Sequence, residues 1–569
     1  QALDVIGSIE QSEGLPHPML DGEWVKKSPL ATQSYLITRF SEANLDELLR
    51  YAQRAGLRYV YHEGPFQTWG HFRLQPDQFP DGEASMQRCV AKAARAGIRL
   101  GVHTLSNFIT PNDPYVTPIP DARLQEIGAS VLEEDVDPET ATIPLRDPDP
   151  FREQQRLSTV MIDGELIRYG GVSASPPWRL LDCERGAFGT HAASHRAGAA
   201  VRKLWDHPYR VFFPNLAMQD ELAARIVALF NTTGLRQISF DGLEGCWATG
   251  HGDYAVNRFV QQCHAGWRHD VISDASLLNH FTWHVHTRAN WGEPWGAAMR
   301  EGMPEYRFNN QRYFERNLFP RMLGWFLMRL ASSDFEATTL DDIEWVLSKA
   351  AGFGAGMALV AHPEVLSGHG MTPEILDLVR EWEAARLSGA FTAEQRLRLR
   401  DPQGEWHLTP TGERMWELRE VAFSKRFVCD AAELQPGQPG GADWPYENRH
   451  GDQPLRFRLR VVPRSTAAGA VVENPSFAVN RRAVTFPVRL EPGQYLICHG
   501  DAQGRVYDAN WHLIRTVPAQ GSASVAPGPQ VVSFSCDFLS ASDRPRVEVV
   551  FCTMGRPEAV VPGSSQARE

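Results

Sequence analysis

The chain has 569 residues, of which 43% are hydrophobic and 22% charged, and its net charge at pH 7 is −12. This length predicts two or three domains, and this balance is typical of a globular protein and not of a disordered one. The negative charge argues against nucleic acid as a partner, because phosphate binding needs a basic surface. The sequence has no run of about twenty apolar residues, so we expect no membrane span.

The chain begins at Gln1, without a Met or a basic-then-apolar leader. We interpret this as a mature or truncated N-terminus and expect a secreted or periplasmic protein whose signal peptide has been removed. The eight cysteines show no Cys-x-x-Cys spacing, which argues against a structural zinc site, and we expect no cofactor or metal. Cys498, Cys536 and Cys552 lie in the last segment, where they form either one disulfide or separate reduced core thiols. The oligomeric state stays open.

Strand-like and helix-like segments alternate from about residue 34 to 385. Helical spacing of apolar residues covers 44–55, 84–96 and 220–231, and glycines close the first two segments. This order predicts a (β/α)8 TIM barrel, with a doubly wound open sheet as the alternative. No Gly-x-Gly-x-x-Gly turn follows the first strand, which disfavours the open sheet. The predicted strands are 34–40, 58–62, 98–105, 210–214, 237–241, 271–273, 282–285 and 356–361.

Two further regions have their own pattern. Residues 112–205 interrupt the barrel with short β segments, including an Asp163-Gly164 hairpin, and we expect a β-rich insert that either shapes a substrate groove or only packs on the barrel. After a Pro/Gly-rich linker, short alternating strands predict a C-terminal antiparallel β-sandwich that either binds carbohydrate or braces the barrel. The expected domains are 1–111 (first part of the barrel), 112–205 (insert), 206–434 (rest of the barrel and trailing helices) and 435–569 (sandwich).

The run from Gln237 to Gly245 brings two carboxylates to one predicted strand tip. Asp241 ends the strand, Gly242 lets the chain turn away, and Glu244 follows. Catalytic side chains collect at the C-terminal ends of barrel strands, and paired carboxylates are typical of glycoside hydrolysis. The alternative for Asp241 is a helix N-cap or an Asx turn, and Glu244 is either a partner acid, a clamp on sugar hydroxyls or a solvated residue.

Four short motifs resemble the α-galactosidase-like (melibiase-like) glycoside hydrolase barrels over residues 34–300. They are the segments 59–64 (YVYHEG), 69–72 (WGHF), 79–82 (FPDG) and 96–103 (AGIRLGVH). The resemblance implies a glycosidase whose nucleophile is the Asp at the tip of the fourth strand, which is Asp241 here. The sequence departs from the family after that residue, because Gly and Leu follow it where the family has Asn-Cys or Met-Asn.

A second group of polar residues follows, between Trp283 and Glu293. In a strand, His284, His286 and Arg288 would share one face. Glu293 lies between two tryptophans, which would raise its pKa as a general acid needs, although it is equally explained as a loop carboxylate beside packing side chains. We expect Asp241, Glu244 and Glu293 to be catalytic. The residues expected to contact the sugar are Tyr61, His62, Glu63, Trp69, His103, His284, His286, Arg288, Asn290 and Trp291.

The same histidines support other functions. With Tyr61 as an alternative base and Arg288 or Asn290 neutralising a uronate carboxylate, the chain would be a polysaccharide lyase. A His-x-His pair with a later Asp would hold a metal, although metallohydrolase barrels usually carry that pair on the first strand. A non-catalytic carbohydrate-binding barrel is the remaining alternative. We therefore predict a glycoside hydrolase acting on a poly- or oligosaccharide, with the lyase as the first alternative.

Overall fold

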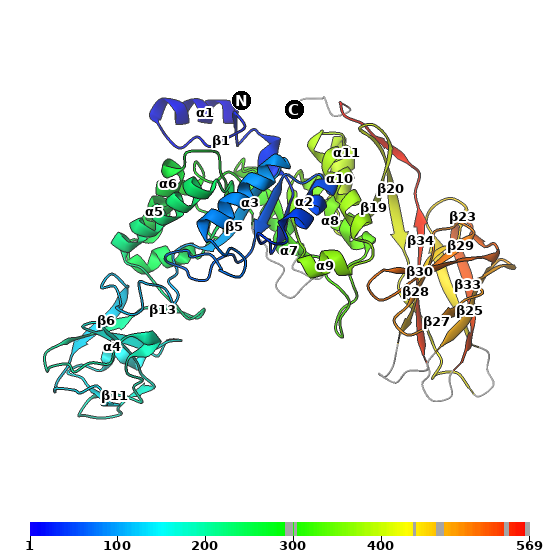
Figure 1. Ribbon diagram of the computed structural model, residues 1–569. Coiled ribbons are helices and arrows are strands. Elements are labelled where there is room, and N and C mark those ends of the chain that lie inside the picture. The colour runs from blue at the N-terminus through cyan, green and yellow to red at the C-terminus, as the bar shows by residue number, and fades with distance from the viewer. Residues whose placement is uncertain (291–299, 301–303, 436–439, 463–470, 540–544, 564–569) are drawn as a thin grey trace. The chain divides into compact units, whose positions relative to one another are not determined.

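The computed structural model describes residues 1–290, 300, 304–435, 440–462, 471–539 and 545–563 (Figure 1). The chain forms two compact units. The first contains residues 1–53, 57–291 and 309–322, and the second contains 54–56, 292–308 and 323–569. Within the described residues, no helix is both long and apolar enough to cross a membrane.

The first unit is built on parallel strands that alternate with helices. Neighbouring strands pair in the order β16-β15-β5-β4-β3. The strands are β3 (Tyr35–Thr38), β4 (Tyr59–His62), β5 (Arg99–Leu105), β15 (Gln237–Asp241) and β16 (Ile272–Ala275). The helices are α2 (Leu45–Arg54), α3 (Glu83–Arg95), α5 (Leu216–Thr233) and α6 (Gly252–Gly266).

The sixth strand position is taken by a short extended segment after β16. Thr287 N–H donates to the Ser273 carbonyl at 3.0 Å, and Ala289 exchanges backbone hydrogen bonds with Pro320 and Met322 at 2.7 and 2.8 Å. This segment therefore joins β16 to the start of β17 (Met322–Leu327). The second unit continues the alternation with α8 (Leu340–Phe353), β18 (Gly356–Val360), α9 (Pro363–Gly368), α10 (Thr372–Leu387) and α11 (Ala393–Leu399).

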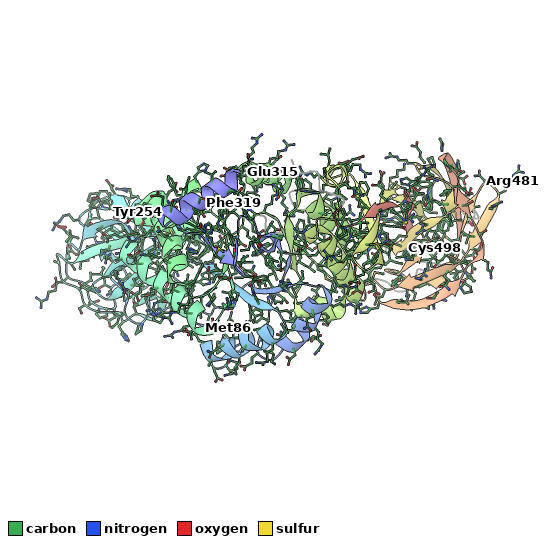
Figure 2. The ribbon with its side chains drawn as sticks, turned by 90° about the horizontal axis from the view of Figure 1, so that it is seen from above. Met86, Tyr254, Glu315, Phe319, Arg481 and Cys498 are labelled. Atoms are coloured by element: carbon green, nitrogen blue, oxygen red, sulfur yellow. The ribbon has the colours of Figure 1, made fainter. Side chains whose placement is uncertain are left out.

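These strand positions form the predicted (β/α)8 barrel architecture, with two corrections to the predicted strands. The predicted strand 210–214 is β14 (Val211–Phe212), which pairs antiparallel with β13 (Asp206–His207) outside the barrel sheet, and β17 was not predicted. The outer faces of the strands pack against helices. On β15, the Phe240 ring lies 6.0 Å from the Phe259 ring of α6 and 6.1 Å from Trp267. In the same layer Met86 on α3 is fully buried, whereas Tyr254 on α6 is exposed (Figure 2).

The insert forms a small β-domain of its own within the first unit (Figure 1). Its main sheet has the order β6-β12-β8-β9. The predicted Asp-Gly hairpin joins β8 to β9, and Asp163 takes the left-handed φ of 51° that this turn requires. Buried Glu165 accepts hydrogen bonds from Arg185, His195 and backbone N–H groups. The strands are β6 (Glu126–Val131), β8 (Thr159–Ile162), β9 (Glu165–Arg168) and β12 (Ala200–Leu204), beside a smaller sheet of β7 (Ile143–Pro144), β10 (Gly171–Val172) and β11 (Arg179–Leu181).

The C-terminal part is the predicted antiparallel sandwich of two sheets over one apolar core. Alternate residues along its strands are buried, as in β24. One sheet has the order β19-β20-β34-β24-β28-β29-β30 and includes β19 (Glu405–Gly412), β20 (Met415–Phe423), β24 (Arg456–Val462), β28 (Tyr495–Cys498), β29 (Gln503–Tyr507), β30 (Leu513–Pro518) and β34 (Arg546–Met554). The other has the order β22-β33-β25-β26-β31 and includes β22 (Gly441–Asn448), β25 (Val472–Val479), β26 (Arg482–Thr485), β31 (Gln520–Gly521) and β33 (Gly528–Phe538).

Two details differ from the simplest expectation. β19 and β20 precede residue 435 but pair within the sandwich sheet, because the alternating burial of Trp406, Leu408, Trp416 and Leu418 suits a sheet face. All eight cysteines are free thiols, so the disulfide alternative for the C-terminal segment does not hold.

The start of α8 offers a stability test. Thr339 Oγ1 accepts the Asp342 N–H at 3.1 Å, while the Asp342 carboxylate accepts the Thr339 N–H at 3.0 Å. This capping box satisfies two otherwise unpaired N–H groups. We predict that Thr339→Ala lowers the free energy of unfolding by about 1 kcal/mol, measured by urea denaturation. Thr339→Ser, which keeps the hydroxyl, should unfold like the wild type, and equal loss in both variants would contradict the capping role.

Candidate functional site

The strand register of the first unit brings polar side chains to one face. His103, Ser239 and Asp274 are level with one another across β5, β15 and β16. Successive side chains along a strand point to opposite faces, so Asp241, two residues beyond Ser239, lies on the same face. Tyr61 pairs with Gly101, which puts it on this face as well. Parallel pairing therefore collects groups that are far apart in the sequence.

Asp241, His103 and Tyr61 form a chain of polar contacts. His103 Nε2 lies 3.8 Å from Asp241 Oδ2, and its Nδ1 lies 3.1 Å from the Tyr61 hydroxyl. Burial lowers the pKa of His103 against the raising effect of Asp241, and burial raises the pKa of Tyr61 well above its ordinary value. A neutral His103 facing a carboxylate carries its proton on Nε2, so we assign Tyr61 as the donor to Nδ1.

The Asp241 tip is held by a tight turn. Gly242 has a φ of 73°, and a Cβ there would lie 3.2 Å from the backbone of Leu105. Ser106 N–H donates to the Asp241 carbonyl at 2.7 Å, and the Asp241 carboxylate accepts the Gly242 N–H at 2.9 Å. A 3-10 helix, η3 (Leu243–Thr249), starts directly after this glycine. The Asp241 side chain stays 24% exposed, so it is accessible from solvent.

Glu244 lies on η3, three residues after Asp241. Its side chain is half-buried. Burial raises its pKa, and the negative charge of Asp241 raises it further. A carboxyl group in this environment keeps its proton to a higher pH than an exposed glutamate does. Glu244 is therefore a candidate for a proton donor at this strand tip.

A buried ion pair lies in the same interior. Arg288 Nε donates to Asp274 Oδ2 at 3.0 Å, and the two side chains are 0% and 1% exposed. The guanidinium lies 4.6 Å from the centre of the Tyr35 ring, and Tyr35 OH accepts from Asn290 Nδ2 at 2.8 Å. In the described part of the chain, both terminal nitrogens of Arg288 and Asp274 Oδ1 have no hydrogen-bond partner. Arg288 is thus paired with Asp274 and is not exposed to solvent.

Three predicted sugar contacts from the early strands have structural roles. His62 is 1% exposed; its Nε2 is 2.8 Å from Gln78 Oε1, and its Nδ1 accepts the Gly64 N–H. Glu63 pairs with Arg39 at 2.7 Å and is 25% exposed. Trp69 is half-buried against a small apolar cluster beside β5. We correct the expectations for His62, Tyr61 and Asn290, because their buried side chains cannot meet a sugar.

The predicted strand over 282–285 is wrong. Asn279 caps a 3-10 helix, η4 (His280–Thr282), and a turn follows it, so His284, His286 and Arg288 do not share a strand face. His284 Nδ1 pairs with the buried Glu10 at 2.6 Å, on α1 (Ala2–Glu13).

The expectation that His286 contacts the sugar is also wrong. Its ring is fully buried, and burial and the nearby Lys26 lower its pKa to about 3. Neither ring nitrogen has a hydrogen-bond partner among the described residues. Trp291 and Glu293 lie outside the described residues.

The structure adds residues that sequence reasoning missed. Asp274 and Tyr35 belong to the polar interior. The charge of Asp241 acts to raise the pKa of His207, although burial lowers it by more. Asp274 had a visible signal, because it is a carboxylate inside the apolar run from Val271 to Ala275. No sequence signal marked His207, because only the tertiary structure brings it near Asp241. Within the described residues, no group of three His, Cys, Asp or Glu side chains is arranged to hold a metal ion.

Searches with the whole chain found fold neighbours but no sequence family. No family model and no curated protein matches. An α-amylase from Geobacillus thermoleovorans, complexed with acarbose, is 9% identical, and the match covers 89% of this chain and 99% of that one with a TM-score of 0.39. An α-galactosidase from Lactobacillus brevis is 13% identical over 89% of this chain and 55% of that one, with a TM-score of 0.36.

Another similar structure is an α-galactosidase from Thermus thermophilus, which is 11% identical over 73% of this chain and 68% of that one, with a TM-score of 0.33. Two of these similar structures are α-galactosidases, the class of barrel that the early-strand motifs resemble.

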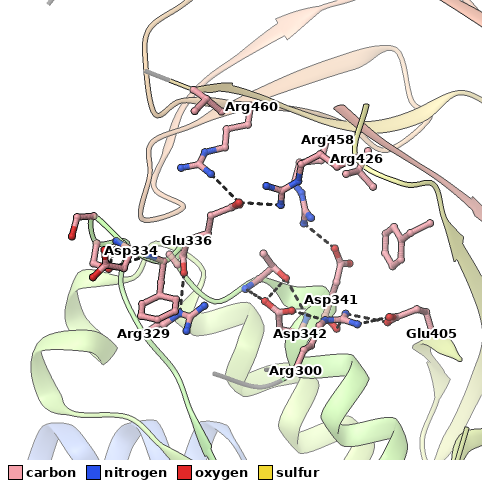
Figure 3. A pocket seen from close by; sticks show the side chains of 18 residues that line it. Arg300, Arg329, Asp334, Glu336, Asp341, Asp342, Glu405, Arg426, Arg458 and Arg460 are labelled. Atoms are coloured by element: carbon pink, nitrogen blue, oxygen red, sulfur yellow. Dashed lines mark hydrogen bonds and ion pairs between the residues drawn. The ribbon is translucent and has the colours of Figure 1, made fainter. Parts of the chain in front are cut away.

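The second unit has a cavity of about 650 Å³ with many charged side chains (Figure 3). Its arginines are largely paired with its acids. Arg300 binds Asp342 and Glu405, Arg458 binds Asp341 at 3.0 Å, and further arginines bind Glu336. These contacts join α8 and the loop before it to the sandwich sheet. We interpret the cavity as a structural ion-pair network.

The Asp274–Arg288 pair gives a second stability test. We predict that Asp274→Asn lowers the free energy of unfolding by about 3–5 kcal/mol, because it leaves a buried guanidinium without a counter-charge. The double variant Asp274→Leu, Arg288→Met should recover much of this loss. Asp220→Asn, which breaks the half-exposed pair with Arg258, should cost about 1 kcal/mol or less. A similar small loss in Asp274→Asn would contradict the role of the buried pair.

Proposed function

We propose that this protein is a glycoside hydrolase that cleaves a poly- or oligosaccharide at the tip of β15. Asp241 acts as the nucleophile or stabilises the positive charge that develops on the sugar ring. Glu244 acts as the general acid. The observation that carries the proposal is the pair of carboxyl groups at one strand tip, of which Glu244 has its pKa raised by burial and by the charge of Asp241.

This division of roles follows from glycosidase chemistry. The leaving oxygen must receive a proton as the glycosidic bond breaks, and the other carboxylate must face the developing oxocarbenium ion. Two carboxyl groups in different environments can hold different protonation states at one pH. His103 Nε2 lies 3.8 Å from Asp241 Oδ2, beside the carboxylate that would face this ion.

The lyase alternative is weaker on this geometry. A lyase needs a cation to neutralise the uronate carboxylate next to the abstracted proton. Arg288, the expected neutraliser, is fully buried and already paired with Asp274. His103 would still suit a base, since its side chain is 17% exposed beside Asp241, so the products should be tested for elimination.

The Asp241→Asn variant tests the central role. We predict that kcat falls by at least about 10³-fold, since the substitution removes the negative charge that meets the reacting carbon.

Activity should be found first by screening polysaccharides and aryl glycosides, reading product mass and absorbance at 235 nm together. Products heavier by one water per cleavage mean hydrolysis, and rising absorbance without added water means elimination. Asp77→Asn, which changes an exposed carboxylate, is the matched control. An unchanged rate in Asp241→Asn would show that Asp241 is neither the nucleophile nor the charge stabiliser.

The Glu244→Gln variant tests the acid. We predict a loss of about 10²–10⁴-fold in kcat on natural glycosides, whose leaving group needs a proton. Aryl glycosides with an acidic phenol should lose far less, because that leaving group departs without protonation. The wild-type rate should fall as pH rises through the elevated pKa of Glu244, and this limb should disappear in the variant. Equal losses on both substrate types would assign the acid to another residue.

A further inference from the structure

A cationic cavity lies where the insert meets the loop after β5. Its volume is about 480 Å³, and its lining consists of Pro111, Arg156, Leu157, Arg168, Phe188 and Arg210. Three of these six residues are arginines, and none is acidic. Arginine stays protonated at any physiological pH, so the cavity concentrates positive charge on a chain whose net charge is −12.

Most of this charge is not neutralised by the protein. In the described part of the chain, the guanidinium groups of Arg156 and Arg210 have no ion-pair partner. Arg168 pairs with Glu184 at 3.1 Å, but that glutamate is 60% exposed and the pair is screened by water. Like charges that share a cavity repel each other, and folding alone does not require them. This distribution of charge suits an anionic ligand.

The backbone around the cavity is rigidly held. The buried Asp206 carboxylate accepts the N–H groups of Arg156, Leu157 and Ser158 at 3.0–3.2 Å, which fixes the start of that wall. Arg168 Nε donates to the Leu157 carbonyl at 3.1 Å. Because Asp206 accepts three backbone donors, it serves the loop and not the arginines. The backbone that carries Arg156 is therefore held in place, while the side chains of Arg156 and Arg210 are exposed to solvent and open to a ligand.

The cavity is connected to the Asp241 tip by short loops. Ser106 binds the Asp241 carbonyl, and three residues later Ile109 pairs with Phe212 of β14 (Val211–Phe212). Arg210 lies at the turn before β14, which follows β13 (Asp206–His207). His207 on that hairpin is close enough to Asp241 for its titration to be affected by the carboxylate. A glycan chain leaving the catalytic tip would thus meet the hairpin that carries Arg210.

We propose that this cavity binds an anionic substituent of the glycan, either a uronate carboxylate or a sulfate ester, and that the natural substrate is an acidic polysaccharide. Arginine matches both groups with two parallel hydrogen bonds. Phe188 adds an aromatic face beside Arg168, with the guanidinium 6.0 Å from its ring centre. This inference rests on the proposed function for its substrate, but its test does not depend on turnover.

Binding by the full-length Asp241→Asn protein tests the proposal. Calorimetry should compare oligogalacturonate, sulfated carrageenan oligosaccharides and neutral cello-oligosaccharides of equal length, each at low and high salt. We expect the acidic ligands to bind at least about tenfold more tightly than the neutral one, and this preference to shrink with salt. Preference for the uronate or for the sulfated ligand identifies the substituent, and either supports the proposal.

Variants locate the binding. Arg156→Gln with Arg210→Gln should weaken acidic-ligand binding by about tenfold or more and leave neutral-ligand binding unchanged. Arg168 is kept, because it holds Leu157 and Glu184. Arg196→Gln, an exposed insert arginine, is the matched control and should change nothing.

Three results would overturn the cavity proposal. They are equal affinity for acidic and neutral ligands, equal losses in the control variant, and equally tight binding of single-stranded DNA, which would indicate unspecific charge attraction. Failure of the proposed function is a separate result, because it shows as undiminished hydrolysis by Asp241→Asn whatever that protein binds.

Discussion

The Arg288–Asp274 ion pair is the constraint around which the barrel interior is arranged. A guanidinium with no exposed surface is stable only with a counter-charge and a polarisable neighbour, which Asp274 and the Tyr35 ring supply. Asp274 comes from β16, Arg288 from the next strand position and Tyr35 from β3. The pair therefore links parts of the barrel that are distant in the sequence, and it leaves the more exposed end of the interior to Asp241.

Burial and charge give the two carboxyl groups at the β15 tip, Asp241 and Glu244, different environments. Burial lowers the pKa of His103, whose Nε2 lies 3.8 Å from Asp241 Oδ2. Glu244 is half-buried, and burial and the charge of Asp241 both raise its pKa. The turn at Gly242 places the two carboxyl groups at one strand tip, where any Cβ on residue 242 would press on the backbone of Leu105. A carboxyl group with a raised pKa at the same tip as a second carboxylate suits the glycoside cleavage that we propose.

The proposed anion site lies where the insert returns to the barrel. The Asp206 carboxylate, just after the insert, orders the loop that carries Arg156, and the hairpin of β13 and β14 carries Arg210. Those arginines and Phe188 make a positively charged recess on an acidic protein. In the function that we propose, the barrel supplies the chemistry and this recess recognises charge on the substrate.

The local pattern of the sequence determined the elements: helical spacing placed α2 and α3, strand alternation placed the sandwich, and Asp163-Gly164 placed the hairpin. The Asp at the end of a β run also marked the tip of β15. Sequence could not decide which polar side chains face the interior together, because that depends on strand register and on burial by distant residues. Only the tertiary structure buried His62 and His286, bound Arg288 to Asp274, and brought Arg156 and Arg210 to one cavity. The physical reason is that local periodicity reports on one element at a time, whereas charge and burial depend on every element packed around a residue.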